Sequence, residues 1–485
     1  MLLTKASNPS IRLLLKRTFH NKNGKLLQRE RRGENPITRT GRILLNDLKT
    51  GYKIITNPGK ITKRFPSETD IVVIGGGAIG SSIAYWLKEK SNVDSFDVVV
   101  VEKDTSYSKS STCLSVGGLR QQFSLSENIQ MSLFGHEFIR TLKTRFGPHA
   151  DVAFTPHGYL VLASEHGADQ LLENAQLQKD LGAINVVLEK HQIKERFPWM
   201  NVDDVALGCL GLEKEGWFDP WSLLKLLQTG SEKKGAQYIN GEVVGFEFRD
   251  VDMNIEGVQK YNTADQPSAV VVKMPDGELK TIRFSLCVIA AGAESGKVAE
   301  KLRIGTGQGI LSVPLPVERR KRYVFVFDCE KNAPGLNTPM TIDYSGAYFR
   351  RDGLGGKFIC GLSPDAENEP DTKDLEVNYE FFDQHVWPLL ARRVDAFNAV
   401  KVKGAWGGFY EYNSFDENGI IGPHPAFTNV YIATGFSGHG IQQSPAIGRA
   451  VSELILDGNF QSIDLTRLGF DRMLLMKPLL EAGII

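Results

Sequence analysis

The sequence predicts an α/β fold, in which a Rossmann-like dinucleotide-binding domain carries an inserted α+β domain built on a mixed or antiparallel sheet. An apolar strand over residues 71–74 runs directly into a glycine-rich turn and a helix. Two further strand-to-glycine turns follow, near residues 290 and 435, with strand-rich stretches between them. The 485 residues exceed the roughly 250 to 300 that a single core can serve, so at least two lobes are expected.

The first 33 residues are strongly basic. They contain nine Lys or Arg residues against one acid, Glu30, with a short apolar patch around Leu13–Leu15. This composition is typical of a mitochondrial presequence, and the patch is too short for a secretory signal. We therefore expect residues 1–66 to be a presequence and linker, and the protein to lie on the matrix side of the inner membrane. The alternative is a disordered basic arm that binds an anionic partner.

The rest of the composition excludes several classes. Acidic and basic residues balance at 57 each, so no global basic field indicates nucleic acid. No apolar run reaches the roughly 18 to 20 residues of a membrane span, so any membrane contact would be peripheral. The five cysteines are scattered without metal-site spacing, which favours a reducing compartment and predicts no metal.

The first motif spans Asp70–Gly80. Gly75, Gly77 and Gly80 occupy the strand-to-helix turn, where glycine admits a pyrophosphate and close helix packing. A second strand over residues 97–101 ends on Glu102, at the distance expected for an acid that binds a ribose hydroxyl. The alternative is a plain glycine-rich turn with a surface glutamate.

The remaining elements are expected in order along the chain. A small, polar segment over residues 104–118 can lie over phosphates and a flat ring, although a plain loop would look similar. Further elements are a helix over 221–230 that Asp219 and Pro220 begin, and a strand that ends at Ala291-Gly292. The last are a strand over 347–351 and a helix that starts at Pro445 after the turn over 435–440.

Domain boundaries follow from these elements. We expect the dinucleotide-binding domain to be discontinuous, over residues 67–152, 213–300 and 403–470. The second domain would take residues 153–212 and 301–402, and residues 471–485 would form a C-terminal tail.

Several motifs together resemble one enzyme family. The first glycine turn with Glu102, the serine-rich loop, the residues 288–293 and the Gly-Phe-Ser-Gly-His-Gly at 435–440 resemble the D-amino-acid oxidase and sarcosine oxidase-like FAD oxidoreductases. The resemblance covers roughly residues 68–460. The segments 114–118, 215–221 and 346–351 resemble a mitochondrial branch of this family that assists the assembly of respiratory complex I.

The resemblance implies that the protein binds FAD. The implied contacts are Gly75, Gly76, Gly77, Ala78, Ile79, Gly80, Glu102, Lys103, Ser111, Thr112, Gly118, Val243, Ala291, Gly292, Gly435, Phe436, Gly438, His439 and Gly440. Sarcosine oxidases attach flavin to a cysteine, whose position falls on Gly407, and dehydrogenase relatives use a histidine, whose position falls on Leu114. The resemblance therefore implies a non-covalent, dissociable FAD.

The implied substrate site departs from the family pattern. The carboxylate-binding lysine falls on Gln442, its partner arginine on Phe123 and the oxygen-activating lysine on Ile359, whereas Arg120 and His439 are kept. In related oxidases the strand around residue 350 supplies a carboxylate-binding arginine, so Arg350 or Arg351 could substitute. Tyr348 could close over the substrate, but an ordinary core tyrosine is the better-supported alternative. Because side chains alternate along a strand, only one arginine of the pair can face the flavin. A surface or interface role for that arginine is about as well supported as a catalytic one.

Three functions remain open from the sequence. One is a flavoprotein that assists complex I assembly and binds its subunits or assembly intermediates. Another is a dehydrogenase or oxidase of a small secondary amine or amino acid, with hydride transfer to flavin N5, tuned by Arg120 and His439. A third, an NAD-dependent dehydrogenase, rests on the first motif alone.

Overall fold

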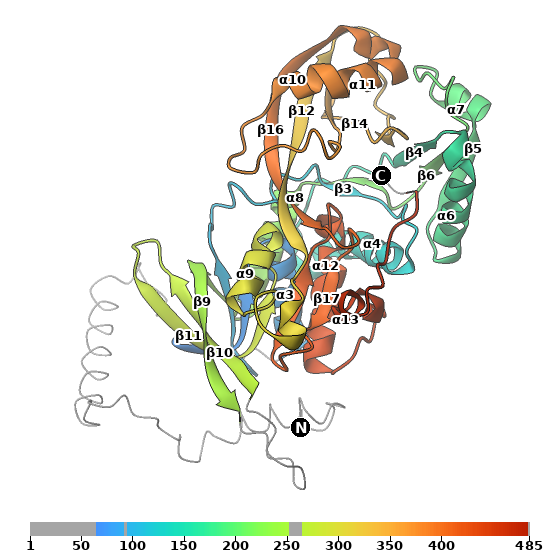
Figure 1. Cartoon of the computed structure of the whole chain (residues 1–485). Coiled ribbons are helices and arrows are strands. Elements are labelled where there is room, and N and C mark those ends of the chain that lie inside the picture. Colours follow the sequence, from blue (N-terminus) through green and yellow to red (C-terminus); the bar gives the residue numbers. More distant parts are fainter. Residues whose placement is uncertain (1–64, 92–94, 252–263, 484–485) are drawn as a thin grey trace, which may run out of the picture. The chain divides into compact units, whose positions relative to one another are not determined.

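The computed structural model describes residues 65–91, 95–251 and 264–483. Residues from Thr69 onward form one compact unit (Figure 1). The expected presequence and linker lie, apart from their last two residues, outside the described part of the chain. Two large sheets and one small sheet, with helices packed on them, confirm the mixed α/β fold.

The first large sheet has the order β17-β18-β11-β1-β2-β8, with β9 and β10 added beside β11. Strands β1, β2 and β8 run parallel, and so do β11 and β18. The unbroken apolar runs in β1 and β2 are buried on both faces, as a central parallel sheet requires. The strands are β1 (Glu68–Ile74), β2 (Val98–Glu102), β8 (Gln237–Asn240), β9 (Glu242–Val251), β10 (Ala264–Lys273), β11 (Leu279–Ile289), β17 (Ile420–Pro423) and β18 (Val430–Thr434).

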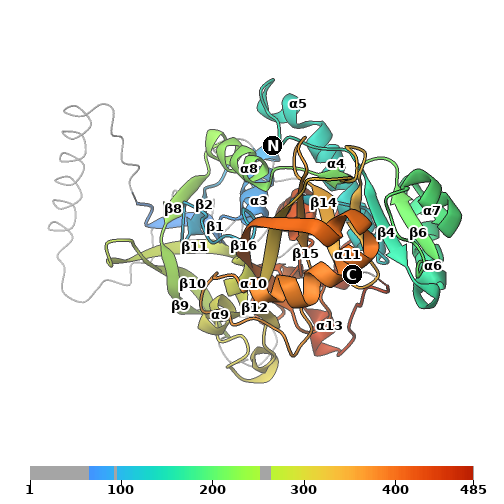
Figure 2. The ribbon, with the colours of Figure 1, turned by 90° about the horizontal axis from the view of Figure 1, so that it is seen from above.

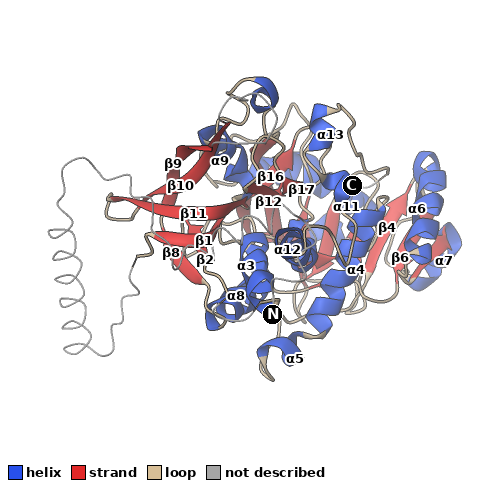
Figure 3. Cartoon of the chain, turned by 90° about the horizontal axis from the view of Figure 1, so that it is seen from below, coloured by secondary structure: helices blue, strands red, loops and turns tan. Residues whose placement is uncertain are grey.

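Helices pack against this sheet and against one another. Helix α3 contacts α8 and α12, and α12 also contacts α4; Figure 3 shows these helices together, away from strands β9 and β10. Ile83 and Leu87 of α3 share one core cluster with Ile447 and Val451 of α12. The helices are α3 (Ala78–Glu89), α4 (Ser126–Arg140), α5 (Leu142–Phe146), α8 (Pro220–Lys233), α9 (Ser295–Lys301), α12 (Gly440–Leu456) and α13 (Asp471–Leu474).

Helix α12 begins earlier than the sequence predicts. The expected start at Pro445 is wrong, because the helix begins at Gly440 and contains Pro445 in its second turn. Proline has no N–H to donate to the carbonyl of Ile441. The hydroxyl of Ser444 donates to that carbonyl instead, at 3.0 Å, which lets the helix continue through the proline.

The second large sheet has the order β16-β12-β15-β14-β13-β4-β6-β5 and is antiparallel apart from the parallel pair β13 and β4. Helices α10 and α11 lie over one end, and α6 and α7 over the other (Figures 1 and 2). The elements are β4 (Tyr159–Ala163), α6 (Ala168–Asp180), β5 (Asn185–Glu189), α7 (Lys190–Arg196), β6 (Leu207–Gly211), β12 (Val317–Cys329), β13 (Met340–Ile342), β14 (Tyr348–Arg351), β15 (Lys357–Gly361), α10 (Tyr379–Phe381), α11 (Trp387–Arg393) and β16 (Val400–Asn413). A small sheet joins β3 (Gly118–Leu119) to β7 (Gly216–Trp217).

The two large sheets draw on alternating segments of the chain. The expected domain boundary at residue 403 falls inside β16, which pairs with β12 from Val400 to Asn413. The strands β12 and β16 therefore reach from the second sheet toward the first, and a cavity lies beside them.

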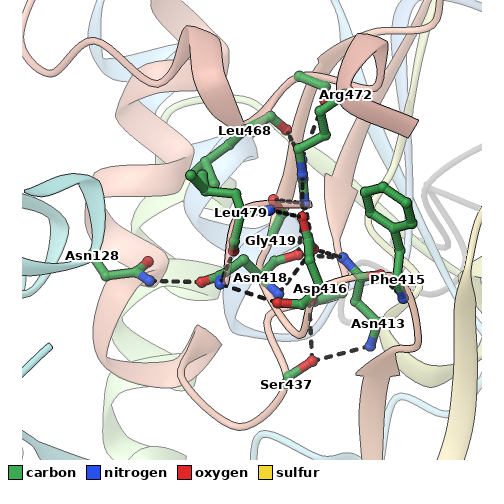
Figure 4. Close-up of polar contacts among 12 residues, drawn as sticks. Asn128, Asn413, Phe415, Asp416, Asn418, Gly419, Ser437, Leu468, Arg472 and Leu479 are labelled. Atoms are coloured by element: carbon green, nitrogen blue, oxygen red, sulfur yellow. Dashed lines mark hydrogen bonds and ion pairs between the residues drawn. The ribbon is translucent and has the colours of Figure 1, made fainter. Parts of the chain in front are cut away.

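The C-terminal tail is fixed by a buried polar network (Figure 4). Arg472 of α13 pairs with Asp416 at 2.6 Å, and both side chains are almost fully buried. The backbone N–H of Leu479 donates to Asp416 at 3.0 Å, and the side chain of Asn418 donates to the carbonyl of Leu479 at 2.7 Å. These bonds hold the tail against the turn that precedes β17.

None of the described helices is both long enough and apolar enough to cross a membrane. No group of three or more His, Cys, Asp or Glu side chains within residues 65–91, 95–251 and 264–483 could hold a metal ion.

Candidate functional site

A cavity of about 1140 Å³ lies where the parallel strands of the first sheet end. This edge is the usual ligand site of such sheets, and the volume exceeds the roughly 300 to 1,000 Å³ of common small-molecule pockets. The cavity reaches from the first glycine turn to β12, β14 and β16 of the second sheet. It can therefore hold an extended ligand with one end under the second sheet.

The first glycine turn is shaped by close backbone contacts. Gly75 has φ of +98°, and a methyl group there would lie 2.2 Å from the carbonyl oxygen of Ala290. A methyl group on Gly80 would lie 1.9 Å from the carbonyl oxygen of Gly75. Only glycine fits at both positions, so the turn keeps β1, β11 and α3 packed closely. The first amides of α3 then face the cavity, where Gly77, Ala78 and Ile79 line it.

Glu102 links this turn to the next loop. Its Oε2 accepts a hydrogen bond from Gly76 N at 2.7 Å, and its Oε1 accepts one from Asp104 N at 2.8 Å. Burial raises the pKa of Glu102, and the backbone hydrogen bonds oppose that shift. Each oxygen keeps a second lone pair, so the carboxylate can still accept from a ribose hydroxyl.

Other predicted cofactor residues surround the same end of the cavity. The hydroxyl of Thr112 accepts a hydrogen bond from Ala78 N at 3.1 Å. Lys103 pairs with Glu242 at 2.7 Å. Lys103 and Thr112 both line the cavity. So do Ser111, Gly118, Val243, Ala291 and Gly292.

The second and third glycine turns are joined by polar contacts. The hydroxyl of Thr434 lies 2.8 Å from the Ser295 hydroxyl and 2.9 Å from Oε2 of Glu411. Gly435 N donates to the same carboxylate oxygen at 3.2 Å, and burial raises the pKa of Glu411. The structure thus brings the turn after β11 beside the turn after β18.

Some predicted cofactor residues shape the site without lining it. Gly438, His439 and Gly440 line the cavity, whereas Gly76, Gly80, Gly435 and Phe436 do not. Phe436 is 1 % exposed and fills the space above Gly419. We conclude that this phenylalanine supports the third turn from behind.

Three of the predicted catalytic residues, Arg120, His439 and Tyr348, belong to the cavity wall. The Arg120 guanidinium lies 4.9 Å from the ring centre of Phe123, and that ring makes an edge contact with His439 at 5.0 Å. Burial and the charge of Arg120 lower the pKa of His439 to about 3, so this imidazole is neutral at physiological pH.

Neither arginine of the predicted pair lines the cavity. Arg350 is buried and donates to the carbonyls of Arg351 and Val116, with its guanidinium 5.2 Å from the ring centre of Trp217. Arg351 donates to the carbonyls of Pro334, Leu354 and Gly355, on the other face of β14. The expected alternation is present, and the structure gives both guanidinium groups backbone partners.

The positions of the family's missing groups are also filled. The side-chain oxygen of Gln442 accepts a hydrogen bond from Arg120 N at 2.7 Å, and Ile359 is buried in β15. A methyl group on Gly407 would lie 2.7 Å from the carbonyl oxygen of Leu375, so that space is taken by the chain itself. Leu114, at the position of the histidine, lines the cavity with an apolar side chain.

The sequence analysis missed several residues of this cavity. Arg322, Tyr410 and Glu411 come from β12 and β16, and Tyr159 comes from β4. No local motif marks these strand positions, because pairing over long sequence distances brings them to the site. Leu480 and Glu481 also line the cavity and come from the C-terminal tail. The residues that hold this tail in place, such as Asp416 and Asn418 in Figure 4, lie far from it in the sequence.

Three glycine turns, a helix N-terminus and a ribose-type acid around one elongated cavity define a dinucleotide-binding flavoprotein site. The family model described as FAD dependent oxidoreductase matches residues 70–454, and the chain belongs to this family. The cofactor is therefore FAD, and the residues at Gly407 and Leu114 are consistent with non-covalent binding.

Individual relatives show which members of the family this chain is similar to. The chain is 45 % identical over 477 residues to the FAD-dependent oxidoreductase domain-containing protein 1 homolog of Drosophila melanogaster, covering 92 % of both chains. It is 24 % identical over 434 residues to the monomeric sarcosine oxidase of Bacillus sp. (strain B-0618), covering 86 % of this chain and 99 % of the relative. The L-proline dehydrogenase from P. horikoshii shares its fold, with a TM-score of 0.70 at 24 % identity over 86 % of this chain and 100 % of that one.

Proposed function

We propose that this chain is a mitochondrial flavoprotein that supports the assembly of respiratory complex I, with its surface binding complex I subunits or assembly intermediates. The observation that carries the proposal is the replacement of the carboxylate-anchoring groups in the part of the cavity that Arg120 and His439 line. Gln442 is hydrogen-bonded to Arg120, Phe123 is packed between Arg120 and His439, and Arg350 is bonded to backbone carbonyls. The groups that would anchor a free amino acid carboxylate are thus replaced or engaged, whereas the FAD end is intact.

The proposal separates cofactor binding from substrate turnover. A ligand that binds only the folded state stabilises it, by about 2.7 kcal/mol at a hundredfold excess over its dissociation constant. FAD can therefore serve the fold of a partner-binding protein. The basic segment within residues 1–33 supports import into the matrix, and a fusion of residues 1–66 to a reporter would test it by fractionation.

Complementation of cells that lack this chain tests the assembly role. We expect Gly75→Ala to abolish FAD binding and to leave complex I assembly defective on native gels. Arg120→Met removes the cavity arginine and should leave both FAD binding and assembly in place. Assembly that fails with Arg120→Met while FAD stays bound would contradict the proposal and support redox turnover.

The second candidate is oxidation of a small secondary amine or amino acid. The observation that favours it is that Arg120, Tyr348 and His439 line one cavity. FAD bound by the glycine turns would supply the two-electron oxidation of the amine to an imine, which water would then hydrolyse. Here Arg120 would bind the substrate or the edge of the flavin ring. The imidazole of His439 is neutral, so it would add no positive charge to the site. The buried Ile359 in place of a lysine favours a dehydrogenase over an oxidase.

A further inference from the structure

One face of the second sheet gives the cavity an apolar surface. The residues of this face that line the cavity are Tyr159 of β4, Met340 and Ile342 of β13, and Tyr348 of β14. Met340 pairs with Tyr159, and Ile342 pairs with Tyr348, in the register of the sheet. Because paired residues of neighbouring strands lie on the same face, these four side chains form one continuous surface, which we call the apolar wall.

Packing holds the apolar wall in place. Three of its residues are buried in one core cluster with Trp217, and Tyr348 packs against that cluster. Gly361 of β15 pairs with Tyr348, and a methyl group there would lie 2.5 Å from the Tyr348 hydroxyl. The phenol ring therefore lies over a residue without a side chain, which extends the wall toward β15.

The charged residues around the apolar wall already have partners. Arg350 shares the face of Tyr348, but it donates to the Val116 carbonyl and does not line the cavity. The charged cavity residues from β12 and from the loop after β15 are each ion-paired: Arg319 with Glu294, Arg322 with Glu369, Lys373 with Asp371, and Asp374 with Lys321. A charged ligand at the wall would lose its hydration without gaining an unpaired counter-charge from this side of the cavity.

We propose that the apolar wall binds an uncharged molecule built on an apolar ring, in the FAD-loaded protein. Aromatic and aliphatic side chains bind such a ring by burying its surface, and they offer nothing to a small zwitterion. The inference concerns binding, so it goes beyond the assembly role. It also names the substrate class of the second candidate function, and that part rests on the second candidate function.

Calorimetric titration of the FAD-loaded full chain tests this class of ligand. The probes are 1-indanone, which is an uncharged ring ketone, benzoate, which is an aromatic anion, and sarcosine, which has no ring. We expect saturable binding of 1-indanone with a negative heat-capacity change, which marks the burial of apolar surface. Benzoate should bind about tenfold more weakly, because its charge is desolvated at the wall, and sarcosine should give no saturable heat.

Variants of the apolar wall locate the binding site. Met340→Gln keeps the length of the side chain and places an amide in the wall. We expect it to weaken the binding of 1-indanone about tenfold, because the ring would cover an amide that then loses its hydrogen bonds to water. Ile342→Thr repeats the test with a smaller change in shape. Met200→Gln is the matched control, because Met200 is also buried but does not line the cavity, and the flavin content of each variant shows that its fold is kept.

Three results would overturn the proposal. Flavin-loaded protein that gives no saturable heat with 1-indanone has no site for an uncharged ring. Benzoate that binds as tightly as 1-indanone would show that Arg120, which lines the same cavity, selects an anion. Equal affinities of the wild type, Met340→Gln and Ile342→Thr for 1-indanone would place the ring elsewhere. Complex I assembly and flavin bleaching are measured separately, so a failure here is distinct from a failure of either candidate function.

Discussion

At Gly75 a single methyl group decides both packing and cofactor binding. Its positive φ and the 2.2 Å approach to the Ala290 carbonyl leave no room for alanine. We expect Gly75→Ala to lower the free energy of unfolding by more than about 2 kcal/mol and to abolish FAD binding. Chemical denaturation and the flavin absorbance of the purified variant check both effects.

The matched control is Gly245→Ala in β9 of the same sheet. No atom lies within 4 Å of a methyl group there, so stability and flavin content should stay at wild-type levels. Wild-type flavin content in Gly75→Ala would contradict the tight turn.

His424 makes stability depend on pH. Burial lowers its pKa to about 4 from 6.5, and its Nδ1 accepts a hydrogen bond from Ala426 N. At pH values between about 4 and 6.5, His424 is protonated in the unfolded chain but not in the folded chain. The free energy of unfolding therefore falls as the pH drops below 6.5. From pH 7 to pH 5 this residue should cost about 2 kcal/mol.

The variant His424→Asn tests this contribution. Its side-chain oxygen can still accept from Ala426 N, and it does not titrate. Urea denaturation at pH 7 and pH 5 should show a smaller loss of stability for the variant than for the wild type. Equal losses would show that His424 is not the group responsible.

Residue positions were predictable where a local motif fixes the geometry. Gly75, Gly77 and Glu102 lie where the strand, turn and acid spacing predicts. The surroundings of Arg350 and Arg351 were not predictable, because each guanidinium also bonds a backbone carbonyl far away in the sequence, Val116 for Arg350 and Pro334 for Arg351.

At the scale of elements, the C-terminal tail caps a helix at the cavity. The Oε2 atom of Glu481 accepts hydrogen bonds from Ser124 N at 2.6 Å and Leu125 N at 3.1 Å, at the N-terminus of α4. Its carboxylate thus meets otherwise unpaired N–H groups and the positive end of the helix dipole. Leu480 and Glu481 also form part of the cavity wall.

We expect Glu481→Ala to lower the free energy of unfolding by about 1–2 kcal/mol, through loss of this cap. Tryptic cleavage in the tail should also become faster, as limited proteolysis followed by mass spectrometry would show. Glu195→Ala, at an exposed position of α7, is the control and should change neither. Equal stability of the two variants would contradict the capping role.

Element boundaries show what sequence alone can and cannot give. Apolar runs predicted β1, β2 and β18, because central parallel strands are apolar on both faces. The start of α12 was misplaced, because proline usually marks a first turn and the Ser444 hydroxyl compensates for it here. The extent of β16 depends on its pairing with β12, which no local pattern reports.

For the whole molecule, FAD is expected to act as a stabilising ligand. The cavity is lined by residues of both large sheets and of the C-terminal tail, so its contents contact segments that are far apart in the sequence. The thermal midpoint of the purified protein should rise with FAD concentration, and a hundredfold excess over the dissociation constant should add about 2.7 kcal/mol. Riboflavin, which lacks the adenosine diphosphate half, should have a much smaller effect in the same thermal scan. Equal shifts would contradict a dinucleotide site.

Non-covalent attachment has a direct consequence for the whole protein. The space at Gly407 is taken by the Leu375 carbonyl, and Leu114 offers no nucleophile. Precipitation with acid should release all flavin into the supernatant, where its fluorescence can be measured. Flavin retained in the washed pellet would show a covalent link and contradict the account.

The most direct test mixes the purified, FAD-loaded protein anaerobically with a panel of N-methyl and D-amino acids and with L-proline, while the flavin absorbance is followed. Because the carboxylate-anchoring positions are replaced or engaged, no compound of the panel should bleach the flavin, and dithionite should still reduce it. Rapid bleaching by one compound would contradict the assembly account and identify the substrate class of an active dehydrogenase.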